Sequence, residues 1–377
     1  MRAAALLAAL ALVAAPALPQ ETQPEQGQVW KGTLGDTPIT ACFFGEDSRE
    51  GVFYADAALE PVRLESQDEN DPSALREMRG FGDPTGAEWS LTMRADGRIE
   101  GQWSKGEERL PIRLTALPVT LPDYGTPCET GAFLDPLLAG GTVTSKRESL
   151  DGTAYTVREY TGPKRAGLDQ FSLVSFALDP VRSGDDAINA ALARHLPDGT
   201  ANSDMGACFG SGLRAGMGTN QDSMMAPLLI TSRWLGVRYS GSDFCGGAHP
   251  NHYILMDTYD RESGAAVDPA AWFGPGALTF YEFDTIPAEG RRAIAGVSAA
   301  LLRALSAHYP EREDRAECLD IMREDRGWQI GLTRAGPVFV PQMPHAAFGC
   351  TEEIVLPWRE ARPFLSPEGR AVMASLK

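Results

Sequence analysis

The sequence lacks the short motifs that mark the common classes of enzyme. Its 377 residues contain no Gly-x-Ser-x-Gly nucleophile turn, no His-Glu-x-x-His zinc motif and no Walker phosphate loop. The glycine-rich segment 206–218 is not expected to open a helix after a buried parallel strand, which argues against a dinucleotide site. Histidine is scarce, with five residues: His195, His249, His252, His308 and His345. No enzyme class is positively indicated, and we expect no cofactor.

Beyond its first residues the chain also lacks a hydrophobic run of the roughly 20 residues needed to span a bilayer. The run at the N-terminus is shorter: Arg2 is followed by apolar residues 3–15 and by Ala15-Pro16-Ala17, a small-x-small sequence that a signal peptidase accepts. Residues 1–17 are therefore predicted to be a signal peptide, with an uncleaved anchor as the alternative. The mature chain is expected to be periplasmic or secreted, with no membrane span.

No Cys-x-x-Cys pair occurs, and the wide, irregular spacing of the cysteines argues against a zinc site, so no bound metal is expected. The cysteines number six, and an even number in an exported chain indicates disulfides. Sequence alone cannot choose among the possible pairings. Pairing neighbours within each presumed domain gives the hypothesis Cys42–Cys128, Cys208–Cys245 and Cys318–Cys350.

Basic residues are outnumbered, with 34 Lys and Arg against 51 Asp and Glu and a formal net charge of −17. Such a surface repels phosphate backbones, so nucleic acid is not an expected partner. It attracts cationic proteins or peptides and speeds their encounter. The alternative is that the acidity only keeps the protein in solution.

Short alternating strands separated by turn residues dominate residues 24–117, for example residues 30–34 and 39–44 on either side of Gly35 and Asp36. This pattern predicts an all-β antiparallel meander, either a small sandwich or a barrel. The acidic stretch 65–71 is expected to be a solvated loop. Residues 118–145 are rich in proline and glycine and are predicted to connect two domains.

Residues 146–377 mix helix and strand patterns and predict an α+β domain with an antiparallel sheet and two main helices. Apolar residues at helical spacing predict a short helix at 183–196 and a longer one at 287–307. The longer helix is expected to be the longest of the chain. Strands are expected at residues 171–178, 228–230, 234–239, 252–259, 328–332, 338–340 and 354–356. The chain as a whole is predicted to be α+β.

The second domain carries a series of motifs in a recognisable order. They are residues 245–251 (Cys-Gly-Gly-Ala-His-Pro-Asn), 259–264 (Tyr-Asp-Arg-Glu-Ser-Gly), 272–273 (Trp-Phe), 344–349 (Pro-His-Ala-Ala-Phe-Gly) and 354–358 (Ile-Val-Leu-Pro-Trp). This series resembles the Gly-Gly-Ala-His-x-Asn loop, and the segments that follow it, of an extracytoplasmic domain of unknown function. That domain is found in RsiV-type anti-sigma factors and in PdaC-type peptidoglycan deacetylases. The resemblance covers about residues 146–370.

The resemblance implies a recognition module that acts near peptidoglycan. In RsiV-type proteins the domain lies outside the membrane and recognises lysozyme, and in the deacetylases it accompanies a separate catalytic domain. This chain is expected to depart from both groups, because it shows no cytoplasmic anti-sigma segment, no membrane helix and no deacetylase domain. No motif of lysozyme contacts can be placed in it, so no contact residue is transferred.

Two hypotheses remain, and they differ over His249. In the first, the chain is a periplasmic binding or sensing module for lysozyme or a peptidoglycan fragment, with a binding surface formed by Gly246, Gly247, His249, Asn251 and His345. In the second, it is a cell-wall hydrolase in which His249 is the acid/base group beside Asp243 or Asp257, or binds a metal with His252. We favour the first, because glycine-flanked loops use such residues for turns and residues three apart on a strand face opposite sides.

Overall fold

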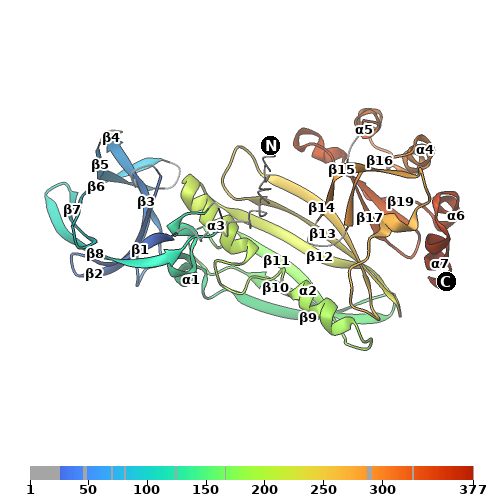
Figure 1. Cartoon of the computed structure of the whole chain (residues 1–377), viewed down its shortest axis with the longest axis horizontal. Coiled ribbons are helices and arrows are strands. Elements are labelled where there is room, and N and C mark those ends of the chain that lie inside the picture. Colours follow the sequence, from blue (N-terminus) through green and yellow to red (C-terminus); the bar gives the residue numbers. More distant parts are fainter. Residues whose placement is uncertain are drawn as a thin grey trace, which may run out of the picture.

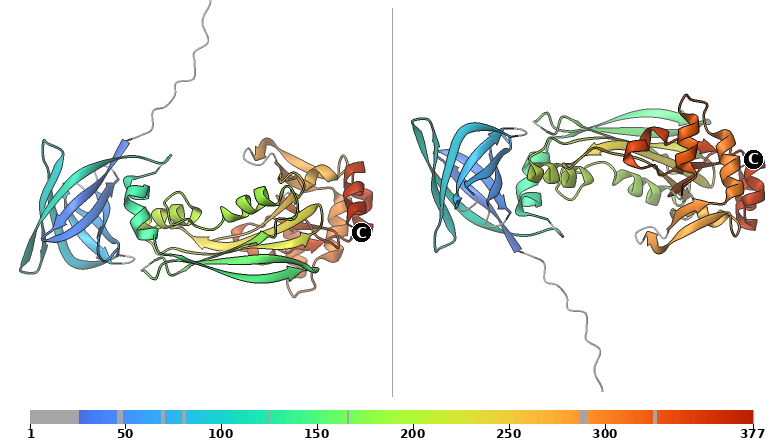
Figure 2. Two further views of the ribbon diagram at one scale, coloured as in Figure 1. Left: turned by 90° about the horizontal axis from the view of Figure 1, so that it is seen from below. Right: turned by 90° about the horizontal axis from the view of Figure 1, so that it is seen from above.

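The computed structural model describes residues 26–376 except for 46–48, 69–70, 80–81, 124, 166, 287–290 and 325–326. The predicted signal peptide, residues 1–17, lies outside the described residues. The molecule is elongated, with a barrel at one end and the C-terminal helices at the other (Figures 1 and 2). It is an α+β protein, as the sequence predicted. None of the helices within the described ranges is long and apolar enough to cross a bilayer.

The first strands close into an eight-stranded antiparallel barrel in which each strand pairs with the next. They are β1 (Gln26–Leu34), β2 (Thr37–Phe44), β3 (Glu50–Ala55), β4 (Val62–Asp68), β5 (Asp71–Arg79), β6 (Asp83–Met93), β7 (Arg98–Lys105) and β8 (Glu108–Thr120). The barrel closes where β1 pairs with β8, from Gln26 opposite Thr120 to Leu34 opposite Ile112. Closure leaves the barrel without the free edges that invite strand addition.

One expectation for this part was wrong. The acidic stretch 65–71 is not a loop, because β4 continues to Asp68 and β5 begins at Asp71. The carboxylate of Glu65 lies 2.7 Å from Arg63 on its own strand and 3.5 Å from Arg76 on β5. Cross-strand charge pairs of this kind compensate acidic residues on the polar face of a sheet.

The segment between the barrel and the next sheet holds η2 (Pro127–Glu129) and α1 (Gly131–Leu138). The disulfide Cys42–Cys128 joins strand β2 of the barrel to η2. One cluster of buried side chains runs across this junction and includes Tyr54 of β3, Phe133 of α1 and Phe209 further along the chain. The hydroxyl of Tyr54 donates a hydrogen bond to the carbonyl of Phe133 (3.0 Å). The barrel and the segment after it therefore share one core.

A six-stranded sheet occupies the middle of the molecule, in the order β14-β13-β12-β11-β10-β9 (Figure 2). Its strands are β9 (Thr142–Leu150), β10 (Thr153–Thr161), β11 (Phe171–Leu178), β12 (Asn220–Ile230), β13 (Trp234–Phe244) and β14 (Asn251–Asp260). Neighbouring strands are antiparallel except β11 and β12, which are parallel. The connection between these two carries α2 (Asp185–Ala193) and α3 (Asp204–Ala215). The expected strands and the helix within 183–196 are confirmed.

The first ten residues of the glycine-rich segment 206–218 belong to α3, which follows α2 and not a strand. The Ser203 side chain caps the helix by accepting a hydrogen bond from the Gly206 amide, and Gly216 ends it in the left-handed conformation. A Cβ at Gly212 would lie 1.9 Å from the Thr219 methyl group. Glycine here allows close packing of the helix and supplies no phosphate-binding loop.

A five-stranded sheet and the remaining helices complete the chain. The strands, in spatial order, are β15 (Leu278–Ile286), β16 (Arg291–Val297), β17 (Trp328–Leu332), β18 (Pro337–Pro341) and β19 (Ile354–Val355). The helices are η3 (Pro269–Trp272), α4 (Ala299–His308), α5 (Arg315–Met322), η4 (His345–Cys350), α6 (Trp358–Ala361), η5 (Arg362–Phe364) and α7 (Pro367–Ser375). The three expected closing strands are confirmed as β17, β18 and β19.

The long helix expected at 287–307 is wrong. Residues 291–297 form strand β16, and α4 begins only after its N-cap Ser298. Residues 287–290 lie outside the described ones. Ile294 of the strand and Leu301 and Leu305 of the helix all enter one core cluster. The apolar residues of β16 and α4 recur at helical spacing across the strand–helix junction, so the sequence pattern resembles that of a single helix. Among the described α-helices the longest is α3, with 12 residues.

The two sheets pack closely where β13 faces β17. A Cβ at Gly236 of β13 would lie 2.2 Å from the backbone oxygen of Leu332 of β17. Within the six-stranded sheet and its helices, a buried ion pair ties the end of β14 to α2, because Arg261 donates two 2.8 Å hydrogen bonds to Asp185. Burial alone would raise the pKa of Asp185, but the hydrogen bonds from Arg261 and from the amides of Arg182 and Val181 hold it below its usual value.

Candidate functional site

The structure brings together the two histidine-bearing motifs that lie almost a hundred residues apart in the sequence. The rings of His249 and His345 stack with centroids 4.0 Å apart and planes 16° from parallel. His252 continues the stack at 5.9 Å from His345 and lies 5.1 Å from the ring of Phe348. All three imidazoles are exposed. We call His249, His252 and His345 the histidine stack.

Two disulfides and a glycine hold the loops that carry the stack. Cys245 is bonded to Cys208 of α3, and Cys350, at the end of η4, is bonded to Cys318 of α5. Together with Cys42–Cys128 these are the pairs expected from the sequence. Gly246 has a φ of +83°, and a Cβ there would lie 2.8 Å from Ala215 at the end of α3. The Gly-Gly sequence thus permits a turn pressed against α3.

Asp243 and Asn251 face each other at the base of this loop, in the β13–β14 ladder. Partial burial raises the pKa of Asp243, while a hydrogen bond from the Asn251 side chain and the charge of His252 act in the opposite direction. Asp243 therefore lies beside His252. The ring of His249 is engaged elsewhere, because its Nδ1 lies 3.0 Å from the carbonyl oxygen of Pro250.

Asp257, the other carboxylate proposed to assist His249, is placed elsewhere. It follows His252 on β14 at an odd spacing, so the two side chains leave opposite faces of the strand. Asp257 lines an open cleft of about 640 Å³. The structure thus separates Asp257 from the histidine stack and places it in a second candidate site.

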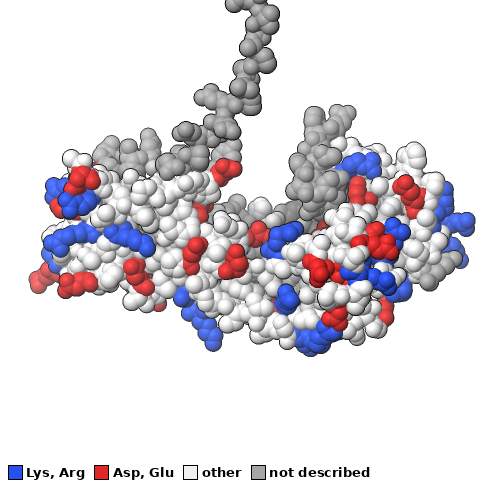
Figure 3. Space-filling view, turned by 60° about the horizontal axis from the view of Figure 1, so that its bottom comes forward, with Lys and Arg blue, Asp and Glu red and all other residues white. Residues whose placement is uncertain are grey.

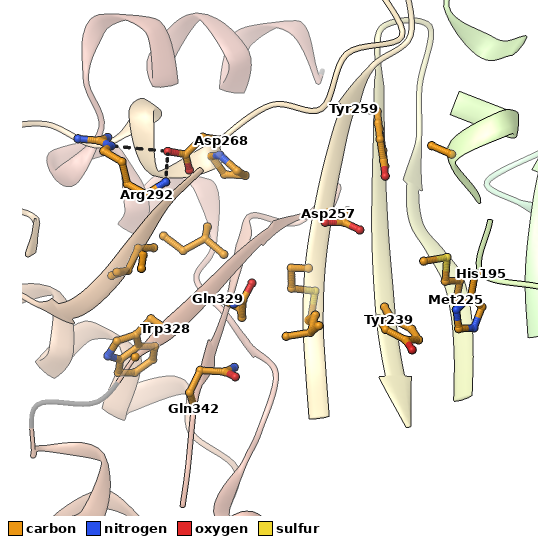
Figure 4. A pocket seen from close by; sticks show the side chains of 18 of the residues that line it. His195, Met225, Tyr239, Asp257, Tyr259, Asp268, Arg292, Trp328, Gln329 and Gln342 are labelled. Carbon is orange, nitrogen blue, oxygen red and sulfur yellow. Dashed lines mark hydrogen bonds and ion pairs between the residues drawn. The ribbon is translucent and has the colours of Figure 1, made fainter. Parts of the chain in front are cut away.

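This cleft lies around the edge strand β14 and extends to the five-stranded sheet. Figure 4 shows His195, Met225 and Tyr239 on the side of the six-stranded sheet, with Trp328, Gln329 and Gln342 on the other. Asp257 points into the space between them (Figure 4). Aromatic rings, side-chain amides and carboxylates are combined in this lining, which is the usual composition of a site for a small polar ligand.

Charges of both signs occur at the rim of the cleft. Asp268 accepts from the backbone amide of Arg292 (3.4 Å), and its carboxylate lies 3.7 Å from the guanidinium of Arg292 (Figure 4). That guanidinium also lies over the ring of Phe280, 4.0 Å from its centroid. Asp204 and Arg194 are the other charged residues of the lining besides Asp257. The cleft can therefore meet a ligand that carries both an ammonium and a carboxylate group.

A buried polar network forms the floor beside α2. His195 Nε2 lies 3.2 Å from the Ser223 hydroxyl, and the His195 ring meets Tyr239 edge-on at 4.6 Å. The Tyr239 hydroxyl lies 3.0 Å from that of Tyr253. Burial lowers the pKa of His195 to about 4 and raises those of both tyrosines. At neutral pH the network is uncharged, which fits a structural floor better than a nucleophile.

In the described part of the chain, one group of side chains has three possible metal-ligand atoms within 4.8 Å of one another, namely Asp314, Cys318 and Cys350. Its two sulfurs form a disulfide and cannot act as thiolate ligands. The stacked imidazoles do not converge on a common point in this arrangement.

Sequence reasoning missed most of the cleft. Tyr239, Asp268, Trp328, Gln329 and Gln342 come from four separate segments, and no motif spacing links them. Asp257 was named, but as a partner of His249. Only the packing of the second sheet beside β14 brings these residues together, so no local signal could have indicated them.

Among known proteins, this chain is similar only in structure to its matches, and not in sequence. No protein-family model and no curated protein sequence matches the chain. Among solved structures, it is similar to a DUF3298 family protein from Pseudomonas aeruginosa, with a TM-score of 0.35 and 13% identity over 62% of this chain and 97% of that one. It is similar also to a DUF3298 family member from Bacteroides fragilis, with a TM-score of 0.34 and 12% identity over 64% and 98%.

Proposed function

We propose that this chain is a periplasmic binding module that takes up a peptidoglycan fragment in the cleft beside β14. The observation that carries the proposal is the composition of the cleft, in which the half-buried Tyr239 and the exposed Tyr281 are combined with Gln329, Gln342 and Asp257. Aromatic rings pack on the apolar faces of sugars, and side-chain amides both donate to and accept from acetamido and peptide groups. Three disulfides fit a compartment outside the cytoplasm.

The carboxylates of the lining fit the peptide part of such a fragment. Asp204, Asp257 and Asp268 can attract the ammonium group of a diamino acid, and Arg194 and Arg292 can attract its carboxylates. A volume of about 640 Å³ lies within the range of small-molecule sites. A disaccharide with a short peptide is therefore of the right size and polarity.

A cationic protein such as lysozyme is the second candidate ligand, supported by the net charge of −17 and by the motif resemblance. On the face shown in Figure 3, however, acidic and basic side chains are interspersed and form no continuous acidic area. A cell-wall hydrolase using His249 is the third reading. His249 has a hydrogen-bonding partner in the Pro250 carbonyl, and Asp243 lies beside His252 instead.

The test is isothermal titration of the oxidised mature protein with a purified disaccharide–tetrapeptide and, separately, with a c-type lysozyme at low and moderate salt. We expect saturable 1:1 binding of the fragment. The Asp257→Asn and Gln329→Ala variants should weaken it by at least about tenfold, or about 1.4 kcal/mol. Asp222→Asn, an exposed carboxylate of β12 outside the cleft lining, is the matched control and should bind normally.

Three other results of these experiments would contradict the proposal or replace it. Fragment binding that is equal in all variants would remove the cleft from the proposal. Lysozyme binding that survives moderate salt and inhibits the enzyme would replace the fragment with a protein ligand. Release of products that ceases in His249→Ala would establish the hydrolase.

A further inference from the structure

We propose that the histidine stack is a binding site for a divalent transition-metal ion of the class that prefers imidazole ligands, with Zn²⁺ as the probe. Three of the five histidines of the chain gather here, from the loop before β14, from β14 itself and from η4. Neutral imidazole suits zinc, copper and nickel, whereas calcium and magnesium prefer oxygen ligands. The proposal is independent of the ligand of the cleft.

A common ion would require the three rings to turn, because as they stand their ligand atoms do not all lie within 4.8 Å of one another. The His249 and His345 centroids are 4.0 Å apart, and His252 lies 5.9 Å from His345. Zinc binds imidazole nitrogen at about 2.0–2.1 Å, so its ligands must approach one another to within a few ångströms. All three residues are exposed, so their rings have room to turn about χ1 and χ2. Stacked rings become convergent ligands when their edges turn toward one ion.

One ring already has the hydrogen bond that metal-bound histidines use. A carbonyl oxygen only accepts, so His249 Nδ1 must carry the proton in its 3.0 Å contact with the Pro250 oxygen. The lone pair of His249 is therefore on Nε2. Metal-binding histidines typically donate their second ring N–H to a carbonyl or a carboxylate, which fixes both tautomer and orientation.

A carboxylate stands beside a second ring. Asp243 is half-buried near the end of β13, and in the β13–β14 ladder it pairs with Asn251, the residue before His252. Carboxylates next to metal-binding histidines raise the basicity of the ring or bind the ion directly. Asp243 can do either when the His252 ring turns.

The backbone that presents the histidines is fixed from both sides. Cys245, four residues before His249, is tied to α3, and Cys350, five residues after His345, is tied to α5. A site on restrained segments loses less conformational entropy on binding than one on free loops. This arrangement favours affinity for the ion itself.

The experiment uses the oxidised mature chain after removal of any histidine tag, titrated calorimetrically with ZnCl₂ at pH 7.5. We expect one saturable site per chain with a Kd below about 10 µM, weaker at pH 5.5 because ligating imidazoles must be unprotonated. His249→Gln and His345→Gln should each weaken binding by at least about tenfold. His308→Gln is the control, because His308 pairs with Glu360 on another element and should not affect Zn²⁺. CaCl₂ should give no saturable heat.

Imidazole NMR of the wild-type chain needs no substitution, so a folding defect in a variant cannot affect the result. The ring signals of His249, His252 and His345 should shift with Zn²⁺, while those of His195 and His308 stay in place. The proposal is overturned if no saturable binding occurs, or if Zn²⁺ binds equally tightly to the double variant His249→Gln/His345→Gln. Far-UV circular dichroism verifies that each variant is folded.

Discussion

At the scale of single residues, burial decides the chemistry of His195. The ring is 6% exposed and packs between Ser223 and Tyr239, where a charged imidazolium would lose its hydration. Burial lowers the pKa of His195 from 6.5 to about 4. The unfolded chain therefore binds a proton at this residue between pH 6.5 and pH 4, while the folded chain does not. The contribution of neutral His195 to the free energy of unfolding is fully present above pH 6.5 and is lost as the pH falls toward 4.

We predict that the free energy of unfolding falls by roughly 3 kcal/mol from this source between pH 6.5 and pH 4. His195→Gln retains a polar partner for Ser223 and cannot gain a charge, so its stability should depend less on pH over the same interval. Urea unfolding at half-unit pH steps measures both chains. If the two pH profiles have the same shape, His195 is not the buried neutral group described.

Individual residues of the histidine stack and the cleft differ in how well sequence could predict them. His249 and Gly246 stand in one motif, and the motif singled them out correctly as neighbours of a turn. The contact of His249 with His345 depends on where η4 lies, which no local pattern specifies. Asp257 was placed with the wrong partner, because assigning side chains to strand faces requires the exact register of β14.

At the scale of elements, the strands were predicted better than the helices. Alternation of polar and apolar residues identifies β11 directly, and short apolar runs indicated β13 and β14. The pattern failed where β16 runs into α4, because Ile294 and Leu301 of different elements continue one another's spacing. No helix was predicted at α3, where Gly206, Gly210 and Gly212 allow the helix to pack closely. Tertiary packing overrides local propensity in both places.

The close contact between the two sheets leads to a prediction for the stability of a variant at Gly236. Gly236→Ala places a methyl group 2.2 Å from the Leu332 oxygen, so β13 and β17 must separate. Overpacking of this kind should lower the free energy of unfolding by about 1–3 kcal/mol. Gly349→Ala is the control, because its Cβ would meet no atom within 4 Å. Urea midpoints that are equal for the two variants would contradict the close packing of the sheets at Gly236.

At the scale of the whole molecule, the barrel is attached to the rest by a shared core and by one disulfide. Closure of the barrel could not be predicted from the sequence, since the pairing of β1 with β8 joins residues some ninety apart. The short strands and turns predicted only a meander that could equally have formed a sandwich. The pairing of Cys42 with Cys128 was a hypothesis based on the order of the cysteines along the chain, and the structure confirms it.

Removing the Cys42–Cys128 disulfide should weaken this attachment. The two residues are 86 apart, and loss of a loop closure of this length costs about 4.6 kcal/mol of stability in the chain-entropy treatment. We expect Cys42→Ala/Cys128→Ala to unfold at lower urea concentration. Tryptophan fluorescence, which reports on Trp30, Trp89 and Trp103 of the barrel as well as on tryptophans beyond it, should then change before the helical circular dichroism signal. Coincident transitions at the wild-type midpoint would show that the shared core holds the barrel without the disulfide.

The parallel pairing of β11 with β12 has a consequence for folding. Strands β9 to β11 follow one another as one antiparallel run, but the neighbour of β11 begins only at Asn220, after two helices. Until β12 pairs with it, the inner edge of the half-sheet stays unpaired, and α2, which packs on β11, is the first element able to cover its face. Completion of the sheet thus waits for a distant strand, and such non-local pairing slows folding. We expect this interval, more than closure of the barrel, to be when the folding chain depends on chaperones.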